Sequence, residues 1–202
     1  MNDGYLTIRQ SATGIYKEKG SKFLSFAFPV NQEREALDLV DRLKKEYYDA
    51  RHHCYAWVLG RDGQIYRTHD AGEPRHTAGD PILNQIRSRG LSDIMVVVVR
   101  YFGGTRLGKS GLINAYKKAT DDVLEKVEPV EKFLYKKVRI HFRYAGMNDI
   151  MRLIDQNNLP IIGQSYESDA SVVISVRESD LERIQEYFAV SPHIFEVRIL
   201  PG

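Results

Sequence analysis

The stretch Ile94–Lys118 constrains this chain most, because a buried strand, a glycine-rich loop and a helix follow one another in it without a break. The apolar run Met95–Val99 is typical of a strand that is buried on both faces. Four glycines then fall within nine residues, and glycine allows sharp turns and a close approach of the backbone to a ligand. From Lys109 to Val127 apolar residues recur every three or four positions, which predicts an amphipathic helix.

Positive charge gathers at this glycine loop, where Arg100, Arg106 and Lys109 stand. Because the free N–H groups at the start of the next helix attract anions, the stretch predicts an anion site. Aromatic side chains beside Arg100 either stack on nucleic-acid bases or belong to the core. A tight strand-to-helix turn whose glycines serve packing alone is the structural alternative. The candidate nucleic-acid- or anion-binding residues are Arg100, Tyr101, Phe102, Gly103, Gly104, Arg106, Gly108, Lys109 and Gly111.

Residues 103–110 also satisfy the phosphate-loop pattern of a glycine, four residues, then glycine, lysine and serine. A phosphate-loop enzyme builds most of its parallel sheet after that loop, whereas here one helix and a domain boundary follow. No second apolar strand ends in an aspartate that could hold magnesium. The sequence therefore argues against nucleotide hydrolysis. The run Gly108-Lys109-Ser110-Gly111 also fits the short loop of KH domains, but only weakly.

A second polar loop, His69–Pro81, concentrates acids, histidines, glycines and prolines between two regular elements, where functional residues tend to lie. Asp70 and Glu73 either act as acid–base carboxylates, cap the following helix, or form an ion pair with Arg100 that holds the two loops together. None of the histidines or acids shows metal-ligand spacing, so we expect no metal and no cofactor. We expect no catalytic residue. The residues assigned to this second side of a cleft are His52, Asp70, Glu73, His76 and Thr77.

Composition restricts the partners. A net charge of +2 over 202 residues gives no overall attraction to nucleic acid, so any basic surface must be local. Cys54 is the single cysteine, which excludes an internal disulfide, favours a buried thiol, and predicts no disulfide-linked partner. Nothing resembles a signal peptide and no apolar run is long enough to span a bilayer. We expect a cytoplasmic protein without a membrane partner.

The remaining pattern predicts an α+β chain with two domains, residues 1–130 and 134–202, joined at 128–132. In the first domain Asn31 is expected to cap a helix that ends near Tyr48, and the segment 82–88 is expected to form another helix. The second domain reads β-α-β-β-α-β, the ferredoxin-like arrangement, with strands expected at 135–144, 161–167, 170–176 and 194–200. Its first strand leaves a moderately basic sheet face.

Two long motifs resemble the YigZ/IMPACT family, and the resemblance covers the whole chain. The first motif is Arg100-Tyr101-Phe102-Gly103-Gly104, followed by Leu107-Gly108, Gly111-Leu112 and Ala115-Tyr116. The second is Asp70, Gly72-Glu73-Pro74, Thr77-Ala78-Gly79 and Pro81-Ile82-Leu83, with Lys22-Phe23, Ala50, His52 and Cys54-Tyr55-Ala56 also fitting. The chain is identified as similar to the bacterial YigZ-like branch, which lacks the RWD domain of eukaryotic IMPACT proteins.

The resemblance implies two folds: a ribosomal-protein-S-five domain-two-like N-terminal domain, and a C-terminal domain similar to the last domain of elongation factor G. The chain also departs from the family pattern. Arg75-His76 stand where the family has serine and glycine, and Lys109-Ser110 where it has threonine and glycine. The phosphate-loop match is thus created by the positions at which this chain leaves its family.

Three functions remain open from the sequence. The leading one is a non-enzymatic protein that binds RNA or the ribosome in a translation-related regulatory role, an inference from fold analogy and from the basic glycine loop. The second is an enzyme or binder that acts on a phosphorylated small molecule or nucleotide. The third is a protein–protein adaptor whose loops are purely structural.

Overall fold

A computed structural model describes residues 3–166 and 170–201, which form two compact units. One unit is Tyr5–Lys132, and the other comprises the described residues from Phe133 onward together with Asp3 and Gly4. The chain is mixed α+β, with five helices and three sheets in its described part. The segment 128–132 contributes to a strand, β7, which pairs with β1 in a two-stranded sheet.

The first unit is built on a five-stranded sheet in the order β2-β3-β6-β4-β5. All four neighbouring pairs in it are antiparallel. The elements of this unit are β1 (Gly4–Ile8), β2 (Ala12–Glu18), β3 (Ser21–Pro29), α1 (Glu33–Glu46), β4 (His52–Leu59), β5 (Ile65–His69), α2 (Gly79–Ser88), β6 (Ile94–Tyr101), α3 (Gly108–Leu124) and β7 (Pro129–Phe133).

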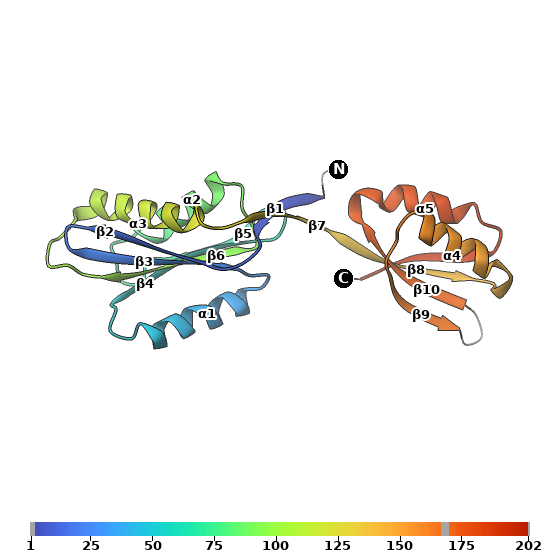
Figure 1. Cartoon of the computed structure of the whole chain (residues 1–202), viewed down its shortest axis with the longest axis horizontal. Coiled ribbons are helices and arrows are strands. Elements are labelled where there is room, and N and C mark those ends of the chain that lie inside the picture. Colours follow the sequence, from blue (N-terminus) through green and yellow to red (C-terminus); the bar gives the residue numbers. More distant parts are fainter. Residues whose placement is uncertain (1–2, 167–169, 202) are drawn as a thin grey trace. The chain divides into compact units, whose positions relative to one another are not determined.

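The central strand β6 is buried on both faces, as its apolar run predicts, because α1 covers one face of the sheet and α2 with α3 the other (Figure 1). Val96 and Val98 pack in the cluster that includes Tyr116 of α3, and Val97 and Val99 pack against α1. Both neighbours of β6 run antiparallel to it. A phosphate-loop strand belongs to a parallel sheet, so the textual match at residues 103–110 lies in a different architecture.

One local expectation in this unit was wrong. Asn31 does not cap α1: the N-cap residue is Gln32, and the Asn31 side chain accepts a hydrogen bond from Lys132 Nζ at 2.6 Å. The backbone N–H of Asn31 instead donates to Glu35 Oε2 at 2.8 Å, so a side chain in the first turn of α1 caps this N–H group. The helix expected at 82–88 is confirmed as part of α2, which begins three residues earlier, at Gly79, where Asp70 accepts hydrogen bonds from the N–H groups at the helix start.

The second unit has the element order β-α-β-β-α-β and a four-stranded antiparallel sheet in the order β11-β8-β10-β9. Its elements are β8 (Tyr135–Phe142), the short 3-10 turn Tyr144–Gly146, α4 (Met147–Gln156), β9 (Ile161–Tyr166), β10 (Ala170–Arg177), the short 3-10 turn Glu178–Asp180, α5 (Leu181–Ala189) and β11 (Ile194–Leu200). The expected strand end at Glu167 lies outside the described residues. Both helices pack on one face of this sheet (Figure 1).

Candidate functional site

A buried ion pair joins the end of β6 to the loop between β5 and α2. Strand alternation turns Arg100 toward α2 and α3, where its Nη1 donates to Glu73 Oε1 at 2.6 Å. The two side chains are only 6% and 4% exposed. Tyr116 of α3 donates its hydroxyl to the same carboxylate oxygen at 2.9 Å, so three elements meet at Glu73. The expected ion pair with Arg100 is confirmed for Glu73.

Arg100 retains an unused donor. Its Nη2 lies 3.4 Å from Ser21 Oγ, but its Nε is buried and has no hydrogen-bond partner within the described residues. The guanidinium lies over the rings of Phe23 and Phe102, with 5.4 Å and 5.7 Å from Cζ to each centroid. A buried N–H without an acceptor costs about 1–3 kcal/mol, so this donor lowers the stability of the fold.

The two loops share one pocket of about 300 Å³. Apolar side chains form much of its wall, and the charged groups come from both loops. Its lining residues are Glu73, Pro74, Arg100, Phe102, Arg106, Leu107, Gly108, Lys109 and Leu112. Of these charges Glu73 and Arg100 cancel, which leaves Arg106 and Lys109 to make the pocket positive.

The start of α3 opens onto this pocket without a cap. Leu107 occupies the N-cap position and makes no side-chain capping hydrogen bond, and the first turn holds no acidic residue. Lys109 and Arg106 are exposed there. The first N–H groups of a helix lack partners inside it and carry partial positive charge. An anion at this end would therefore meet backbone donors and two cations together.

The glycines of the loop have different roles. Gly103 packs against the turn between β2 and β3, where a Cβ atom would lie 1.8 Å from the carbonyl carbon of Gly20. Its N–H donates to Ser21 Oγ at 3.2 Å. This N–H group is therefore not available to a ligand, contrary to the expectation from the sequence. Gly104 and Gly108 have φ of +89° and +70° with open space where a Cβ would stand. Gly103 thus serves packing, and the other two serve the turn.

Asp70 holds its own loop in shape and does not pair with Arg100. Its Oδ1 accepts from the N–H groups of Ala78 and Gly79 at 3.0 and 2.9 Å, and its Oδ2 from that of His76 at 2.9 Å. Burial raises the pKa of the Asp70 carboxyl, but the three N–H donors outweigh burial and hold the pKa below its usual value. Among the three roles considered for Asp70, which were acid–base catalysis, helix capping and an ion pair with Arg100, the geometry supports helix capping.

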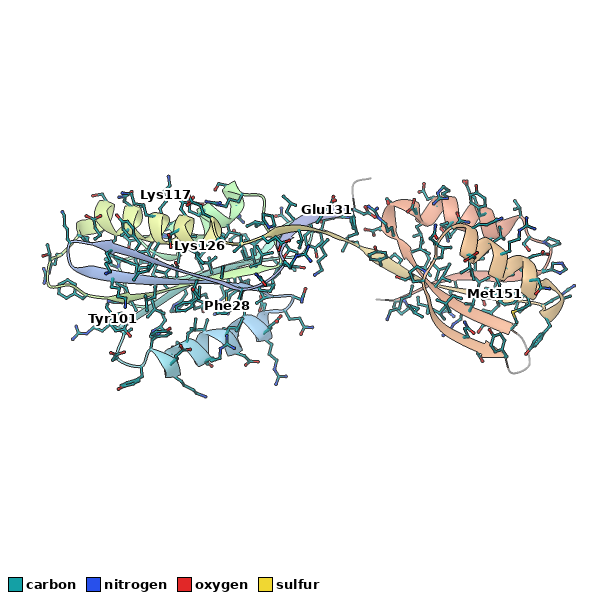
Figure 2. The ribbon with its side chains drawn as sticks, viewed as in Figure 1. Phe28, Tyr101, Lys117, Lys126, Glu131 and Met151 are labelled. Atoms are coloured by element: carbon teal, nitrogen blue, oxygen red, sulfur yellow. The ribbon has the colours of Figure 1, made fainter. Side chains whose placement is uncertain are left out.

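The other residues assigned to this site lie elsewhere. Tyr101 points to the opposite side of the sheet, toward α1, and donates to Asp49 at 2.8 Å (Figure 2). His52 Nδ1 lies 2.9 Å from the carbonyl oxygen of Ala71, and Thr77 donates to that of Pro74 at 2.7 Å. His76 Nδ1 lies 2.6 Å from Asp80 Oδ2 on the surface. None of these four, nor Gly103, Gly104, Gly111 or Asp70, lines the pocket.

Cys54 is a buried thiol, as expected. Its Sγ lies 3.0 Å from the carbonyl oxygen of Asp70 and 3.2 Å from the hydroxyl oxygen of Tyr116. Burial raises the pKa of this thiol far above its ordinary value, which disfavours the thiolate needed for nucleophilic attack. In the portion of the chain that the structure describes, no three histidine, cysteine or acidic side chains are arranged to hold a metal ion.

Sequence reasoning missed five residues that build the pocket or its support: Ser21, Pro74, Leu107, Leu112 and Tyr116. The signal for Tyr116 was present, because a hydroxyl on the apolar stripe of a buried helix needs a polar partner. Pro74, Leu107 and Leu112 lie in the two family motifs but, as apolar residues, carry no chemical signal, and Ser21 lies outside both motifs.

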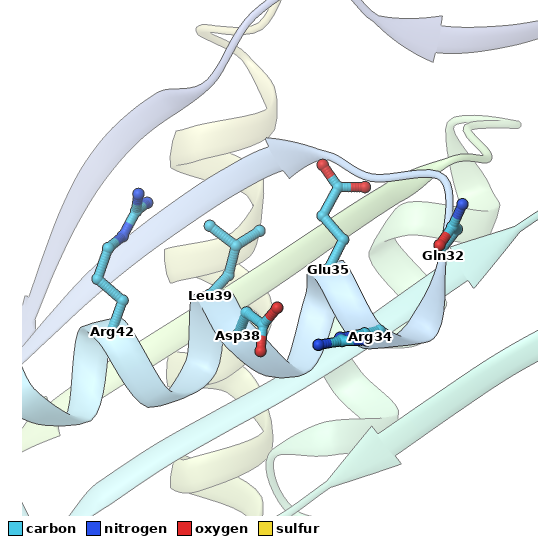
Figure 3. A pocket seen from close by; sticks show the side chains of 6 residues that line it. All are labelled: Gln32, Arg34, Glu35, Asp38, Leu39 and Arg42. Carbon is cyan, nitrogen blue, oxygen red and sulfur yellow. The ribbon is translucent and has the colours of Figure 1, made fainter.

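A second, larger hollow of about 440 Å³ runs along α1 (Figure 3). Its lining residues are Gln32, Arg34, Glu35, Asp38, Leu39 and Arg42, which all come from α1 or its N-cap. Charges of both signs alternate there on a single helix, and no second element closes the hollow in the described residues. It is a solvated helix face, whereas the pocket at Arg100 joins residues far apart in the sequence. Across the described residues, no helix is both long and apolar enough to cross a membrane.

The chain is similar to proteins of one known family. The model of the Impact N-terminal domain matches residues 19–124, which include both loops of the pocket. The IMPACT family member YvyE of Bacillus subtilis is 29% identical over 187 residues, covering 93% of this chain and 86% of that protein. The IMPACT family member YigZ of Escherichia coli is 32% identical over 168 residues, 82% of each chain.

A crystal structure of a protein described as hypothetical superposes with a TM-score of 0.74 at 27% identity, covering 100% of this chain and 98% of that one. Because a family model spans half of the sequence and a relative above 30% identity spans most of it, the resemblance carried by the two motifs is confirmed. The chain belongs to the IMPACT family.

Proposed function

We propose that this protein binds RNA through the pocket at Arg100, without catalysis, in a translation-related role. The observation that carries the proposal is the meeting of both loops at one positive pocket, which is lined by Arg106 and Lys109 at the uncapped start of α3. An RNA phosphate would accept from the open N-terminus of α3 and from Arg106 and Lys109.

The apolar wall of the pocket suits a base beside that phosphate. Phe102 is 52% exposed at its rim, and every nucleic-acid base can stack on an aromatic ring. Pro74, Leu107 and Leu112 supply further apolar surface. Stacking on one ring with phosphate contacts beside it gives affinity without reading sequence, so we expect tolerance of base identity.

The candidate catalytic groups are all engaged in the fold, which supports binding over chemistry. The Asp70 carboxylate already accepts three backbone hydrogen bonds. Glu73 is held by Arg100 and Tyr116. Both carboxylates thus already have structural partners in the fold, which favours a structural role over that of a general base.

A nucleotide or phosphorylated small molecule is the second candidate ligand. The volume of the pocket, about 300 Å³, favours it, because that size is at the lower end of small-molecule sites and suits a single compact ligand. The same cations would hold its phosphate.

A thermal-shift comparison separates the two candidates. The melting temperature is measured in the presence of single-stranded oligouridylate and, separately, of each mononucleotide. Each measurement is made both with and without magnesium. Binding to the folded state raises the melting temperature. A shift with the oligonucleotide alone supports the RNA proposal, and an equal shift with a mononucleotide that is lost in Lys109→Ala overturns it in favour of the small ligand.

The finer fold assignments belong to the same proposal. We assign the first unit to the ribosomal-protein-S-five domain-two-like folds, and the second, by its strand order β11-β8-β10-β9, to the ferredoxin-like folds. Both fold types recur in proteins that contact RNA, which is an argument by analogy. A cytoplasmic location accords with the single reduced, buried Cys54.

A further inference from the structure

The sheet of the second unit has one covered and one open face. Val138, Ile140 and Phe142 of β8 pack with α4 and α5 in the core of this unit. Both helices lie on that one side of the sheet (Figure 1). Within the described part of this unit, no helix covers the opposite face.

Strand alternation determines which side chains reach the open face. Residues of β8 two apart share a face, so Tyr135, Lys137, Arg139 and His141 lie opposite the buried set. Arg139 stands directly across from Arg198 of β11. The open face is therefore basic along β8 and along the neighbouring edge strand, β11.

Three of these cations are exposed and unneutralised. Lys137, Arg139 and Arg198 form no ion pair with any described residue, and Glu196 on the same strand as Arg198 lies 3.7 Å from His141. Like charges directly opposite on paired strands repel each other. Because the whole chain carries a net charge of only +2, this positive surface is a local feature.

Exposed aromatic rings flank the cations at both ends of β8. Tyr135 is 54% exposed at the start of the strand. At its far end Phe195, also 54% exposed, lies with its ring 5.9 Å from that of His141. His141 is six positions along the strand from Tyr135, which corresponds to about 20 Å.

We propose that this open sheet face is a contact surface for single-stranded RNA. Stacking platforms with cations between them suit an unpaired polyanion whose bases are exposed, and a four-stranded sheet with surface aromatics is an established mode of RNA recognition. A second copy of the chain would bring arginine against arginine. The choice of RNA over other polyanions rests on the proposed function, whereas the surface involves residues entirely separate from the pocket at Arg100.

The test uses the full chain and fluorescence anisotropy with labelled oligouridylate over a range of salt. Arg139→Gln with Arg198→Gln removes two charges from the face. Arg152→Gln with Arg183→Gln is the matched control, since both arginines lie on helices of the same unit. We expect roughly tenfold weaker binding for the first pair only. We also expect a salt slope shallower by about 1.4, since each phosphate contact on a single strand contributes about 0.7.

Two further measurements assign the ligand. Phe195→Ala is expected to weaken binding roughly tenfold, as loss of a base-stacking ring does. Polyglutamate at matched charge is expected to compete poorly. If the two double arginine variants bound RNA with equal affinity, the proposal for the sheet face would be overturned. This result could occur even if Arg106→Ala with Lys109→Ala abolished binding, so the sheet-face proposal can fail while the pocket proposal holds. Full competition by polyglutamate would overturn it in favour of an acidic protein.

Discussion

Arg100 and Glu73 form an ion pair, with 2.6 Å between Nη1 and Oε1, in a place where both side chains are nearly free of solvent contact. The pair ties the end of the central strand to the loop before α2. Tyr116 adds a third element through the same carboxylate oxygen. The pocket wall therefore depends on a buried charge that is compensated by a single opposite charge.

Replacing Glu73 by glutamine is expected to destabilise the protein by about 3–5 kcal/mol, because Arg100 would stay buried without a counter-charge. Urea unfolding measures the change. Glu128→Gln is the matched control, since Glu128 pairs with Arg9 on the surface at 2.8 Å, and exposed pairs contribute about 0–1 kcal/mol. If the two variants lost equal stability, the buried pair would not have the role assigned to it.

Asp70 gives a prediction for pH. Its carboxyl pKa is held below the ordinary value of 3.8, so its ionised form stabilises the fold above that pH. This stabilisation is lost as pH falls through 3.8 toward the lower folded pKa. We expect Asp70→Asn to lose stability near neutral pH and to show a flatter decline on acidification. Asp62→Asn, on an exposed turn, is the control. An acid profile of Asp70→Asn parallel to wild type would count against the assignment.

Two adjacent glycines allow a clean comparison. Gly103→Ala would place a Cβ against the backbone of Gly20, and we expect a loss of about 3 kcal/mol from overpacking. Gly104→Ala meets no atom and faces only its positive φ, so we expect about 1–2 kcal/mol. Thermal unfolding of the two variants tests the difference. A reversed order would mean that the loop does not pack on the β2–β3 turn.

The thiol of Cys54 is expected to resist modification in the folded protein. Burial raises the pKa of this thiol, so little thiolate forms at pH 8. Burial also keeps the reagent from reaching the sulfur atom. Ellman's reagent should react only as fast as the protein unfolds, and the rate should rise with urea. Rapid labelling of the folded chain would show that the thiol is accessible and would reopen a nucleophilic role.

The sequence predicted those features that local pattern determines. The apolar run 95–99 predicted a fully buried strand, and the polar loop before α2 predicted a partner for Arg100. The opposite orientations of Arg100 and Tyr101 could also have been read from the alternation of side chains along a strand, so assigning both to one site was an avoidable error.

What the sequence did not indicate depends on residues that are distant along the chain. Gly103 packs on Gly20, more than eighty positions away, and no local signal identifies such a contact. Residue type alone allows Asp70 to pair either with Arg100 or with backbone amides. Only the fold of the loop 69–81, which turns three N–H groups toward Asp70, decides between the two.

The salt dependence of RNA binding is the decisive measurement for the pocket at Arg100. Anisotropy with oligouridylate should show that Arg106→Ala with Lys109→Ala weakens binding and makes the slope of log affinity against log salt shallower by about 1.4. Lys44→Ala with Lys45→Ala, on α1 at the opposite face of the sheet, should leave both quantities unchanged. Absence of RNA binding by the wild-type chain at low salt, or an unchanged slope in the pocket variant, would contradict the claim.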